Sequence, residues 1–313
     1  MNRTELKKIA IAGAGIMGSS IAQIFAQNDY QVILYDIEGR FLARSKELIA
    51  LNQKALIQAG ELSEEASCNI RSLIGHTLDI SGFKDADFVI EAIVEQMDAK
   101  HALWSKISEL VSEEAILTSN TSGLSISEIA KAVRKPERFC GMHWINPPHI
   151  VPLVEVICGA KTKAETADTV FRVAESVGKK PIMVKKDAPG FALNRIQFAV
   201  LREAMHIVES GIADKEDVDK VLKYGLGMRY ACLGPFEVAD LGGLDTFYRI
   251  AEYLFEDLSD AKEVPSMLKD LVTGGAWGVK SGKGFYDYSD GRGDEVISKR
   301  DADFIKIAGI LYK

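Results

Sequence analysis

The chain has 313 residues, of which 47% are hydrophobic and 27% charged, and its formal net charge is −7 at pH 7. This length allows two domains, the acidic balance argues against nucleic-acid binding, which needs a basic surface, and no apolar run is long enough to span a bilayer. The apolar stretch at residues 9–12 is too short for a secretory signal and the four cysteines form no C-x-x-C pair, so we expect a cytosolic protein without a metal site or disulfides.

The first part of the chain alternates strand-like and helix-like segments. Short apolar runs predict strands, and apolar residues three and four positions apart predict helices. In chain order we predict a strand at 8–12, a helix that contains Met17–Phe25, a strand at 31–35, helices at about 39–59 and 63–74, a strand at 87–91, a helix at about 98–111 and a strand at 115–118. Strand, helix and strand in this order predict a parallel, doubly wound α/β sheet.

The pattern changes near Asp187–Gly190. Before this segment, residues 153–157 and 181–184 still read as strands. After it the patterns are helical only, at about 191–210, 214–224 and 243–258. We therefore predict an α/β domain over residues 1–187 and an all-α domain over 188–313.

A glycine turn, Gly13-Ala-Gly-Ile16-Met17-Gly18, lies between the first strand and the first helix. In this context Gly13 permits a tight turn, Gly15 lets a pyrophosphate approach the backbone, and Gly18 allows close packing of helix on sheet. Asp36 ends the second strand, where a carboxylate accepts hydrogen bonds from ribose hydroxyls and repels a 2′-phosphate. These features predict a Rossmann-type site for NAD rather than NADP, although the nearby Arg40 would favour NADP.

Polar side chains also follow the strand at 115–118, in the segment Ser119-Asn120-Thr-Ser122. Ligands of open parallel sheets bind beyond the carboxyl ends of the strands, so we expect this loop to face the cofactor. A helix cap explains Ser125, which has capping-box spacing to Glu128. It does not explain Asn120 or Ser122.

His143 and Glu155 form a candidate acid–base pair. Glu155 lies inside the apolar strand 153–157, where a lone charge is costly to bury, so it needs a partner. His143 precedes Asn146-Pro147-Pro148 and is the best candidate. A lone histidine is more often structural, but a carboxylate partner fixes its tautomer and suits it to take a proton from an alcohol.

These segments together resemble the L-3-hydroxyacyl-CoA dehydrogenases, which include short-chain 3-hydroxybutyryl-CoA enzymes. The resemblance spans nearly the whole chain and rests on these motifs: Gly13–Gly18, Val94-Glu95, Ser119–Ser122, His143–Pro147, Leu153–Val156, Pro189–Phe191 with Asn194-Arg195, Gly234–Phe236 with Asp240, and Lys280–Tyr286.

The resemblance implies a role for each matched position. His143 would be the general base, Glu155 would orient it, and Ser122 and Asn194 would hold the oxygen of the substrate. It also implies fatty acid metabolism and a homodimer formed mainly by the helical domain, which closes over the substrate. The implied cofactor contacts are the glycine turn with Ile16 and Met17, Asp36, Glu95, Lys100, Asn120, Asn146 and Lys280.

Two departures concern the substrate. Relatives that use CoA carry a lysine-rich stretch where this chain has residues 57–61, Ile-Gln-Ala-Gly-Glu, so that Lys46 and Lys54 are the remaining candidates for phosphate contacts. Arg229 precedes the Gly234 motif, as a similar Arg-Tyr does in gulonate dehydrogenases of the lambda-crystallin type, and it could clamp a substrate carboxylate.

Three hypotheses follow from these motifs. The first is an NAD-dependent dehydrogenase of short-chain L-3-hydroxyacyl-CoA. The second is an NAD-dependent dehydrogenase of a free 3-hydroxy acid or a related small carboxylate. The third is a non-catalytic, crystallin-like nucleotide-binding protein, since a fold alone does not prove a function.

Overall fold

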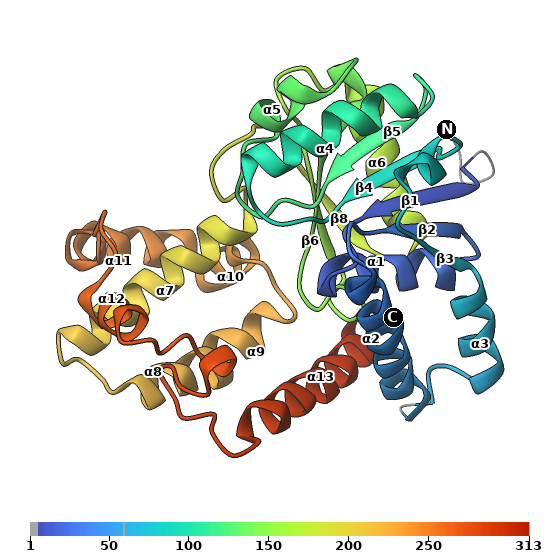
Figure 1. Ribbon diagram of the computed structural model, residues 1–313. Helices are drawn as coiled ribbons and strands as arrows, with labels where there is room; N and C mark the ends of the chain where they lie inside the picture. The colour runs from blue at the N-terminus through green and yellow to red at the C-terminus, as the bar shows by residue number, and fades with distance from the viewer. Residues whose placement is uncertain (1–5, 59, 313) are drawn as a thin grey trace. The chain divides into compact units, whose positions relative to one another are not determined.

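One eight-stranded sheet forms the centre of the N-terminal part of the chain (Figure 1). The computed structural model describes residues 6–58 and 60–312. The chain divides into two compact units, the first ending at Asn194 and the second beginning at Arg195, a few residues after the boundary that the sequence predicts at 187. Each unit is described separately below.

The strands of the first unit lie in the order β3-β2-β1-β4-β5-β6-β7-β8. All neighbouring strands are parallel except β6 and β7, which run antiparallel. The strands are β1 (Lys8–Ala12), β2 (Gln31–Tyr35), β3 (Ile74–Thr77), β4 (Phe88–Glu91), β5 (Ile116–Ser119), β6 (Phe139–Trp144), β7 (Leu153–Ile157) and β8 (Lys180–Val184). The predicted doubly wound sheet is confirmed, with one antiparallel pair that the sequence did not indicate.

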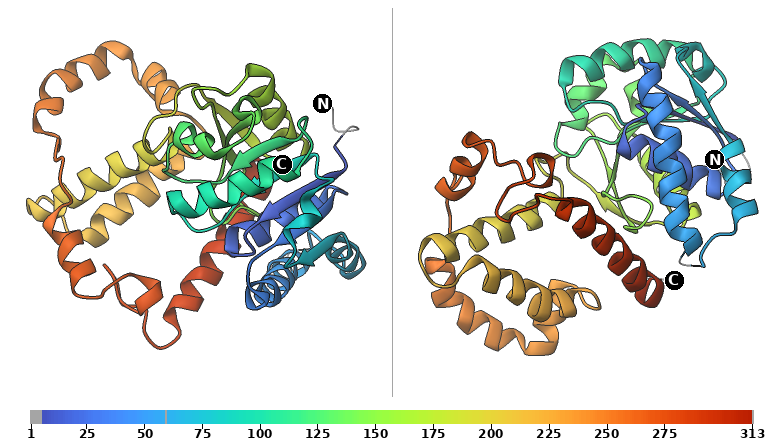
Figure 2. Two further views of the ribbon diagram at one scale, coloured as in Figure 1. Left: turned by 45° about the horizontal axis from the view of Figure 1, so that its top comes forward. Right: turned by 60° about the horizontal axis from the view of Figure 1, so that its bottom comes forward.

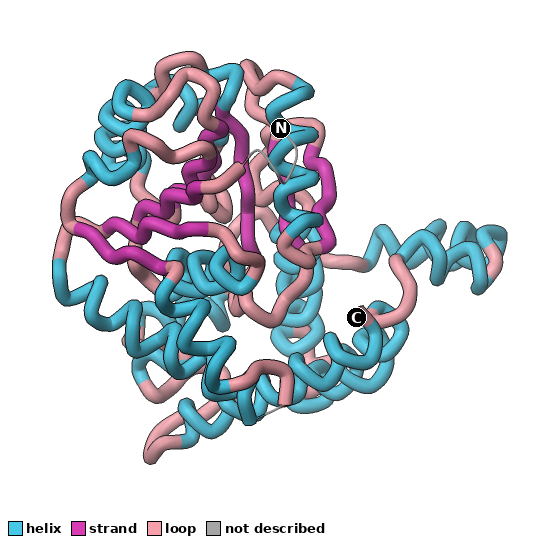
Figure 3. Tube along the Cα trace, turned by 90° about the vertical axis from the view of Figure 1, so that its right-hand side faces the viewer, coloured by secondary structure: helices cyan, strands magenta, loops and turns pink. Residues whose placement is uncertain are grey.

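Helices cover both faces of this sheet (Figure 3). Buried residues of α1, α2, α3 and α6 form one apolar cluster with one side of the strands, and those of α4 and α5 form a second cluster with the other side. These helices are α1 (Ile16–Gln27), α2 (Gly39–Gln58), α3 (Glu64–Ser72), α4 (Met97–Leu110), α5 (Ile126–Ile129) and α6 (Ala164–Ser176). The strands β1, β4, β5, β6 and β7 are almost entirely buried, which is typical of a sheet covered by helices on both faces.

Several predicted boundaries need correction. The helix predicted at 63–74 ends at Ser72, and Ile74 begins β3, where it pairs with Val32 of β2. The helix predicted at 39–59 is described to Gln58, and Ala59 lies outside the described residues. The helix predicted from 191 begins at Leu193, because Gly190 and Phe191 have positive φ angles of 76° and 51°, which a right-handed helix excludes.

The second unit consists of helices and loops, drawn from yellow to red in Figure 2. Its first helix, α7 (Leu193–Glu209), begins two residues before the division, and the helix predicted at 214–224 is α8 followed by a π-helical turn at Val221–Leu226. Within the described residues, no helix combines the length and the apolar character needed to cross a membrane. The other helices are α8 (Lys215–Lys220), α9 (Gly227–Tyr230), α10 (Pro235–Gly242), α11 (Leu244–Asp257), α12 (Ser266–Thr273) and α13 (Arg292–Leu311).

Candidate active site

The glycine turn connects β1 to α1 and can take no larger residue at two of its positions. Gly13 has a φ angle of 105°, and a Cβ atom there would lie 2.4 Å from the carbonyl oxygen of Ala92. A Cβ atom on Gly18 would lie 1.8 Å from the carbonyl oxygen of Gly13. Gly15 instead faces open space, and no side chain caps the N-terminus of α1 at this residue. The first N–H groups of α1 are therefore available to a phosphate.

Asp36, directly after β2, lies beside this turn. Its Oδ2 atom accepts a hydrogen bond from the Ala14 N–H at 2.8 Å, and its Oδ1 atom accepts one from the Glu38 N–H at 3.3 Å. The Arg40 Nε atom lies 2.7 Å from a Glu38 carboxylate oxygen. The arginine that would favour NADP is therefore paired with a carboxylate, which supports the preference for NAD.

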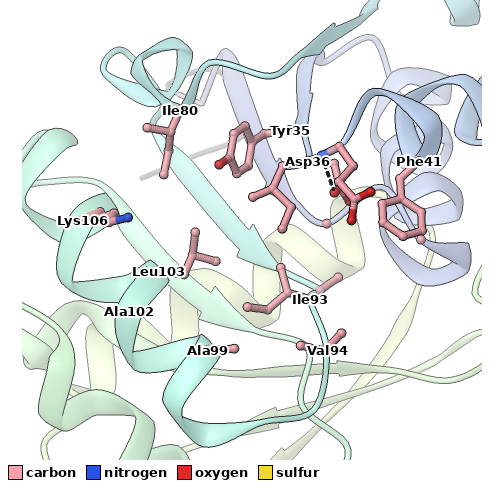
Figure 4. A pocket seen from close by; sticks show the side chains of 15 residues that line it. Tyr35, Asp36, Phe41, Ile80, Ile93, Val94, Ala99, Ala102, Leu103 and Lys106 are labelled. Atoms are coloured by element: carbon pink, nitrogen blue, oxygen red, sulfur yellow. Dashed lines mark hydrogen bonds between the residues drawn. The ribbon is translucent and has the colours of Figure 1, made fainter.

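A cavity of about 510 Å³ adjoins the turn and Asp36 (Figure 4). Ile93 and Val94, from the loop after β4, and Leu103, from α4, line the side opposite Asp36 and Phe41. Largely apolar walls, the carboxylates of Asp36 and Glu38 at one side and the glycine turn suit an adenosine and its pyrophosphate. The residues present thus fit NAD.

His143 and Glu155 lie directly opposite each other on the antiparallel strands β6 and β7. The His143 Nδ1 atom is 2.7 Å from Glu155 Oε2, and both side chains are buried. The Glu155 Oε1 atom accepts hydrogen bonds from the Ala192 and Leu193 N–H groups, each at 2.9 Å. Burial alone would raise the pKa of Glu155, but the hydrogen bonds from His143, Leu193 and Ala192 hold it below its ordinary value. An ionised Glu155 accepts the Nδ1 proton and leaves the Nε2 lone pair of His143 to act as a base.

The loop after β5 is held in place by side chains from other segments. Glu95 Oε1 accepts hydrogen bonds from the Thr121 hydroxyl and from the Ser122 N–H, the latter at 2.9 Å. Asn194 Nδ2 donates to the Ser122 carbonyl at 2.8 Å. Asn120 Oδ1 accepts the N–H of Trp144, the residue after His143, at 2.8 Å. The Ser122 loop, the β6 strand of the histidine and the start of α7 are therefore bonded to one another.

A buried ion pair lies behind this loop. Lys100 Nζ, in the first turn of α4, is 2.5 Å from Glu91 Oε1 and 3.2 Å from Glu95 Oε2. Glu91 and Lys100 are both 0% exposed. Burial alone would raise the pKa of Glu95, but the Thr121 hydroxyl and the charge of Lys100 lower it below its ordinary value.

The structure brings most of the expected residues of the first unit together. Ser122 lies near Asn194, Glu95 and Asn120, and His143 is paired with Glu155. Asn146 is exposed just after β6, and Lys54 is exposed on α2. Arg229 (in α9) and Lys280 (in a 3-10 turn) are exposed in the second unit.

Sequence reasoning missed three residues that organise this region. Glu91 was read only as the last residue of a buried strand, and its position at a strand end, nine residues before Lys100, was the available signal. Thr121, which donates its hydroxyl proton to Glu95, lies between the candidate residues Asn120 and Ser122. Asp187 was read as a boundary, yet its carboxylate accepts hydrogen bonds from the Ser125 hydroxyl and the Ser127 N–H, at 2.7 and 2.8 Å.

Comparison with known proteins shows the same two-part organisation. The family model for the 3-hydroxyacyl-CoA dehydrogenase NAD binding domain matches residues 8–188, and the model for the 3-hydroxyacyl-CoA dehydrogenase C-terminal domain matches residues 190–288. A probable 3-hydroxybutyryl-CoA dehydrogenase of Deinococcus radiodurans is 41% identical over 90% of this chain and 100% of its own length.

Two further relatives match over most of the chain. A 5-formyl-3-hydroxy-2-methylpyridine 4-carboxylate 5-dehydrogenase of Mesorhizobium japonicum is 34% identical over 98% of both chains, and a crystal structure of an enzyme with this activity, described as an NAD⁺-dependent dismutase, superimposes with a TM-score of 0.92 over 98% of both chains. The (S)-3-hydroxybutyryl-CoA dehydrogenase of Ralstonia eutropha has a TM-score of 0.76 over 91% of this chain and 100% of its own, at 34% identity.

The glycine turn with Asp36, the paired His143 and Glu155, and both family models agree. The chain therefore belongs to the 3-hydroxyacyl-CoA dehydrogenase family and is an NAD-dependent oxidoreductase.

Proposed function

We propose that this enzyme oxidises the 3-hydroxyl group of a short-chain L-3-hydroxyacyl-CoA to the 3-keto compound, reversibly and with NAD. The observation that carries the proposal is the 2.7 Å contact between His143 Nδ1 and the buried Glu155 carboxylate. Glu155 holds the ring in one tautomer, so Nε2 accepts the proton of the hydroxyl. NAD supplies the hydride acceptor when it is bound.

The other residues of the site bind and orient. We assign the Ser122 hydroxyl and the free donor of the Asn194 amide to the oxygen that changes from hydroxyl to carbonyl. On the cofactor side, the glycine turn and α1 hold the pyrophosphate and Asp36 the adenosine ribose. Glu95, Lys100, Asn120, Asn146 and Lys280 remain proposed cofactor contacts.

The substrate class rests on similarity. The Deinococcus radiodurans relative, 41% identical, is named a probable 3-hydroxybutyryl-CoA dehydrogenase, and by analogy this chain would act in fatty acid metabolism. Lys46 and Lys54, both exposed on α2, are the candidates for the CoA phosphates. We also propose a cytoplasmic homodimer, which the exposed apolar side chains of the second unit support.

A second substrate class is favoured by specific observations. The Mesorhizobium japonicum relative is named for a free pyridine carboxylate. In this chain Gln58 and Glu61 stand where a lysine-rich stretch would favour CoA, and Arg229 offers a guanidinium to a free carboxylate. A dehydrogenase of free 3-hydroxy acids or related small carboxylates is therefore the alternative.

One assay separates the two classes. NADH formation is measured with L-3-hydroxybutyryl-CoA and with free 3-hydroxy acids, for the unchanged enzyme and for Arg229→Ala. The first proposal expects turnover of the CoA ester and little change in its KM in the variant. Turnover of free acids alone, with at least a tenfold rise of their KM in Arg229→Ala, would establish the alternative. No turnover of either class, with NAD still bound, would contradict both proposed substrate classes.

A further inference from the structure

The buried pair Glu91 and Lys100 has no place in the chemistry proposed above. Burying an ammonium and a carboxylate is expensive unless both are fully bonded, so such a pair needs an explanation. Both side chains are fully buried. Lys100 contacts Glu91 and also Glu95, whose other carboxylate oxygen is bonded to the loop that carries Ser122.

Glu91 is fixed first, at the carboxyl end of β4. Its Oε1 atom accepts the Ile93 N–H at 3.0 Å as well as the Lys100 ammonium, and its Oε2 atom accepts the Ser119 hydroxyl at 2.6 Å. Ser119 is the last residue of β5. The carboxylate thus joins the ends of two neighbouring strands and fixes the ammonium between them.

Lys100, held by Glu91, in turn restrains the side chain of Glu95. The Glu95 side chain is 41% exposed and would move freely without a partner, but Lys100 holds its Oε2 atom at 3.2 Å. The other oxygen, Oε1, accepts the Thr121 hydroxyl and the N–H groups of Ser122 and Gly123, at 2.9 and 3.3 Å for the two amides. Each contact in this series, from Glu91 through Lys100 and Glu95 to the Ser122 loop, is a charge-assisted hydrogen bond, the strongest kind in proteins.

We propose that Glu91 and Lys100 are positioning residues for the reaction, which act through Glu95 to fix the peptide of Ser122 and with it the Ser122 hydroxyl. The inference rests on the proposed role of Ser122 in binding the substrate oxygen. It gives Lys100 a task beside the cofactor contact that the family resemblance implies, because its ammonium lies between the Glu91 and Glu95 carboxylates.

The test uses the full-length enzyme and two substitutions. Lys100→Met keeps the length of the side chain but removes its charge, and the double variant Glu91→Gln/Lys100→Met leaves no unpaired buried charge should the single variant fail to fold. We expect kcat to fall by about 10- to 100-fold, the effect of a small misplacement of a reacting group. We also expect hydrogen exchange of the Ser122 and Gly123 amides to rise at least about tenfold, since they lose a fixed acceptor.

A double-mutant cycle with Ser122→Ala separates positioning from general stability. If Lys100 acts on Ser122, Lys100→Met lowers kcat by less than about twofold once the Ser122 hydroxyl is gone. Equal losses in both backgrounds, or unchanged exchange at Ser122 and Gly123, would overturn the inference.

Lys179→Met is the matched control. Lys179 is another buried lysine, 8% exposed, and it donates to the Pro148 and Val151 carbonyls at 2.5 and 2.9 Å. Its loss should lower Tm without changing Ser122 exchange and without coupling to Ser122. A failure of the proposed function looks different, because Ser122→Ala alone would then keep full kcat on every substrate.

Discussion

The two units of this chain bury their apolar side chains to very different extents. The first unit encloses two apolar clusters, one on each face of its sheet. Beyond Asn194, Met205 and Val218 are the only apolar side chains among the described residues that count as buried. On α11, Leu244, Tyr248 and Phe255 repeat at helical spacing and are 61%, 65% and 73% exposed.

This difference assigns separate tasks to the units. A sheet covered on both faces is a rigid support, and the site residues of the first unit lie on its strands, in the loops that follow them and at the starts of α4 and α7. The second unit exposes many large apolar side chains, as expected for the homodimer proposed above. The comparison predicts that changes in the first unit affect chemistry and changes in the second affect association.

The largest effect is expected at His143. In His143→Ala the base is gone, so kcat should fall by about two to four orders of magnitude. NAD affinity and Tm should stay close to those of the unchanged enzyme, which fluorescence titration and thermal unfolding would measure. A fall of less than threefold in kcat would contradict the assignment of the base.

The second unit is tested at Phe255. Burial of one phenylalanine contributes about 1.5–3 kcal/mol, and a two-fold symmetric interface contains it twice. Phe255→Asp should therefore weaken dimerisation by about 100-fold or more, seen as a halved mass by light scattering at micromolar concentration. Lys262→Asp, an exposed change in a loop of the same unit, is the control. A Phe255→Asp protein that remains dimeric would show that α11 lies outside the interface.

Glu155→Gln should have a smaller effect than loss of the histidine. Glutamine can still accept hydrogen bonds from the Ala192 and Leu193 amides, but the negative charge that stabilises the protonated imidazole of His143 is lost. We expect kcat to fall by about tenfold and the pH profile of kcat/KM to move on its acid side. An unchanged profile would mean that Glu155 serves only to hold the start of α7.

The smallest effect concerns acid stability. Burial alone would raise the pKa of Asp187, but the Ser127 N–H and the Ser125 hydroxyl hold it below its ordinary value of 3.8. A carboxyl whose folded pKa is depressed stabilises the fold above its unfolded pKa, and this contribution disappears as pH falls through the folded pKa. Asp187→Asn should lower Tm by about 2–4 °C at pH 7 and by less near pH 3. An equal loss of Tm at both pH values would show that the charge of Asp187 does not stabilise the fold.

The sequence predicted the glycine turn, Asp36 and most strands because each is marked by residues close together in the chain. It missed β3, whose four residues include one apolar side chain and depend on pairing with β2. It also missed α10, α12 and α13, in which no apolar side chain is fully buried and no core face marks the helix.

In the site, too, only features marked by residues close together in the chain could be predicted. His143 and Glu155 could be paired because an unaccompanied carboxylate inside a strand needs a partner. The bonds of Glu95 to Ser122 and of Asn194 to Ser122 join residues 27 and 72 positions apart, and no local pattern marks them.

Asp36 has a consequence for engineering the cofactor preference. The carboxylate that would turn away a 2′-phosphate also accepts the Ala14 amide inside the glycine turn. Replacing it with a neutral or basic residue to admit NADP would leave that amide without its acceptor and loosen the turn that binds the pyrophosphate. Redesign of this enzyme for NADP would therefore begin with a loss of affinity for both dinucleotides, and a new acceptor for Ala14 would have to be built first.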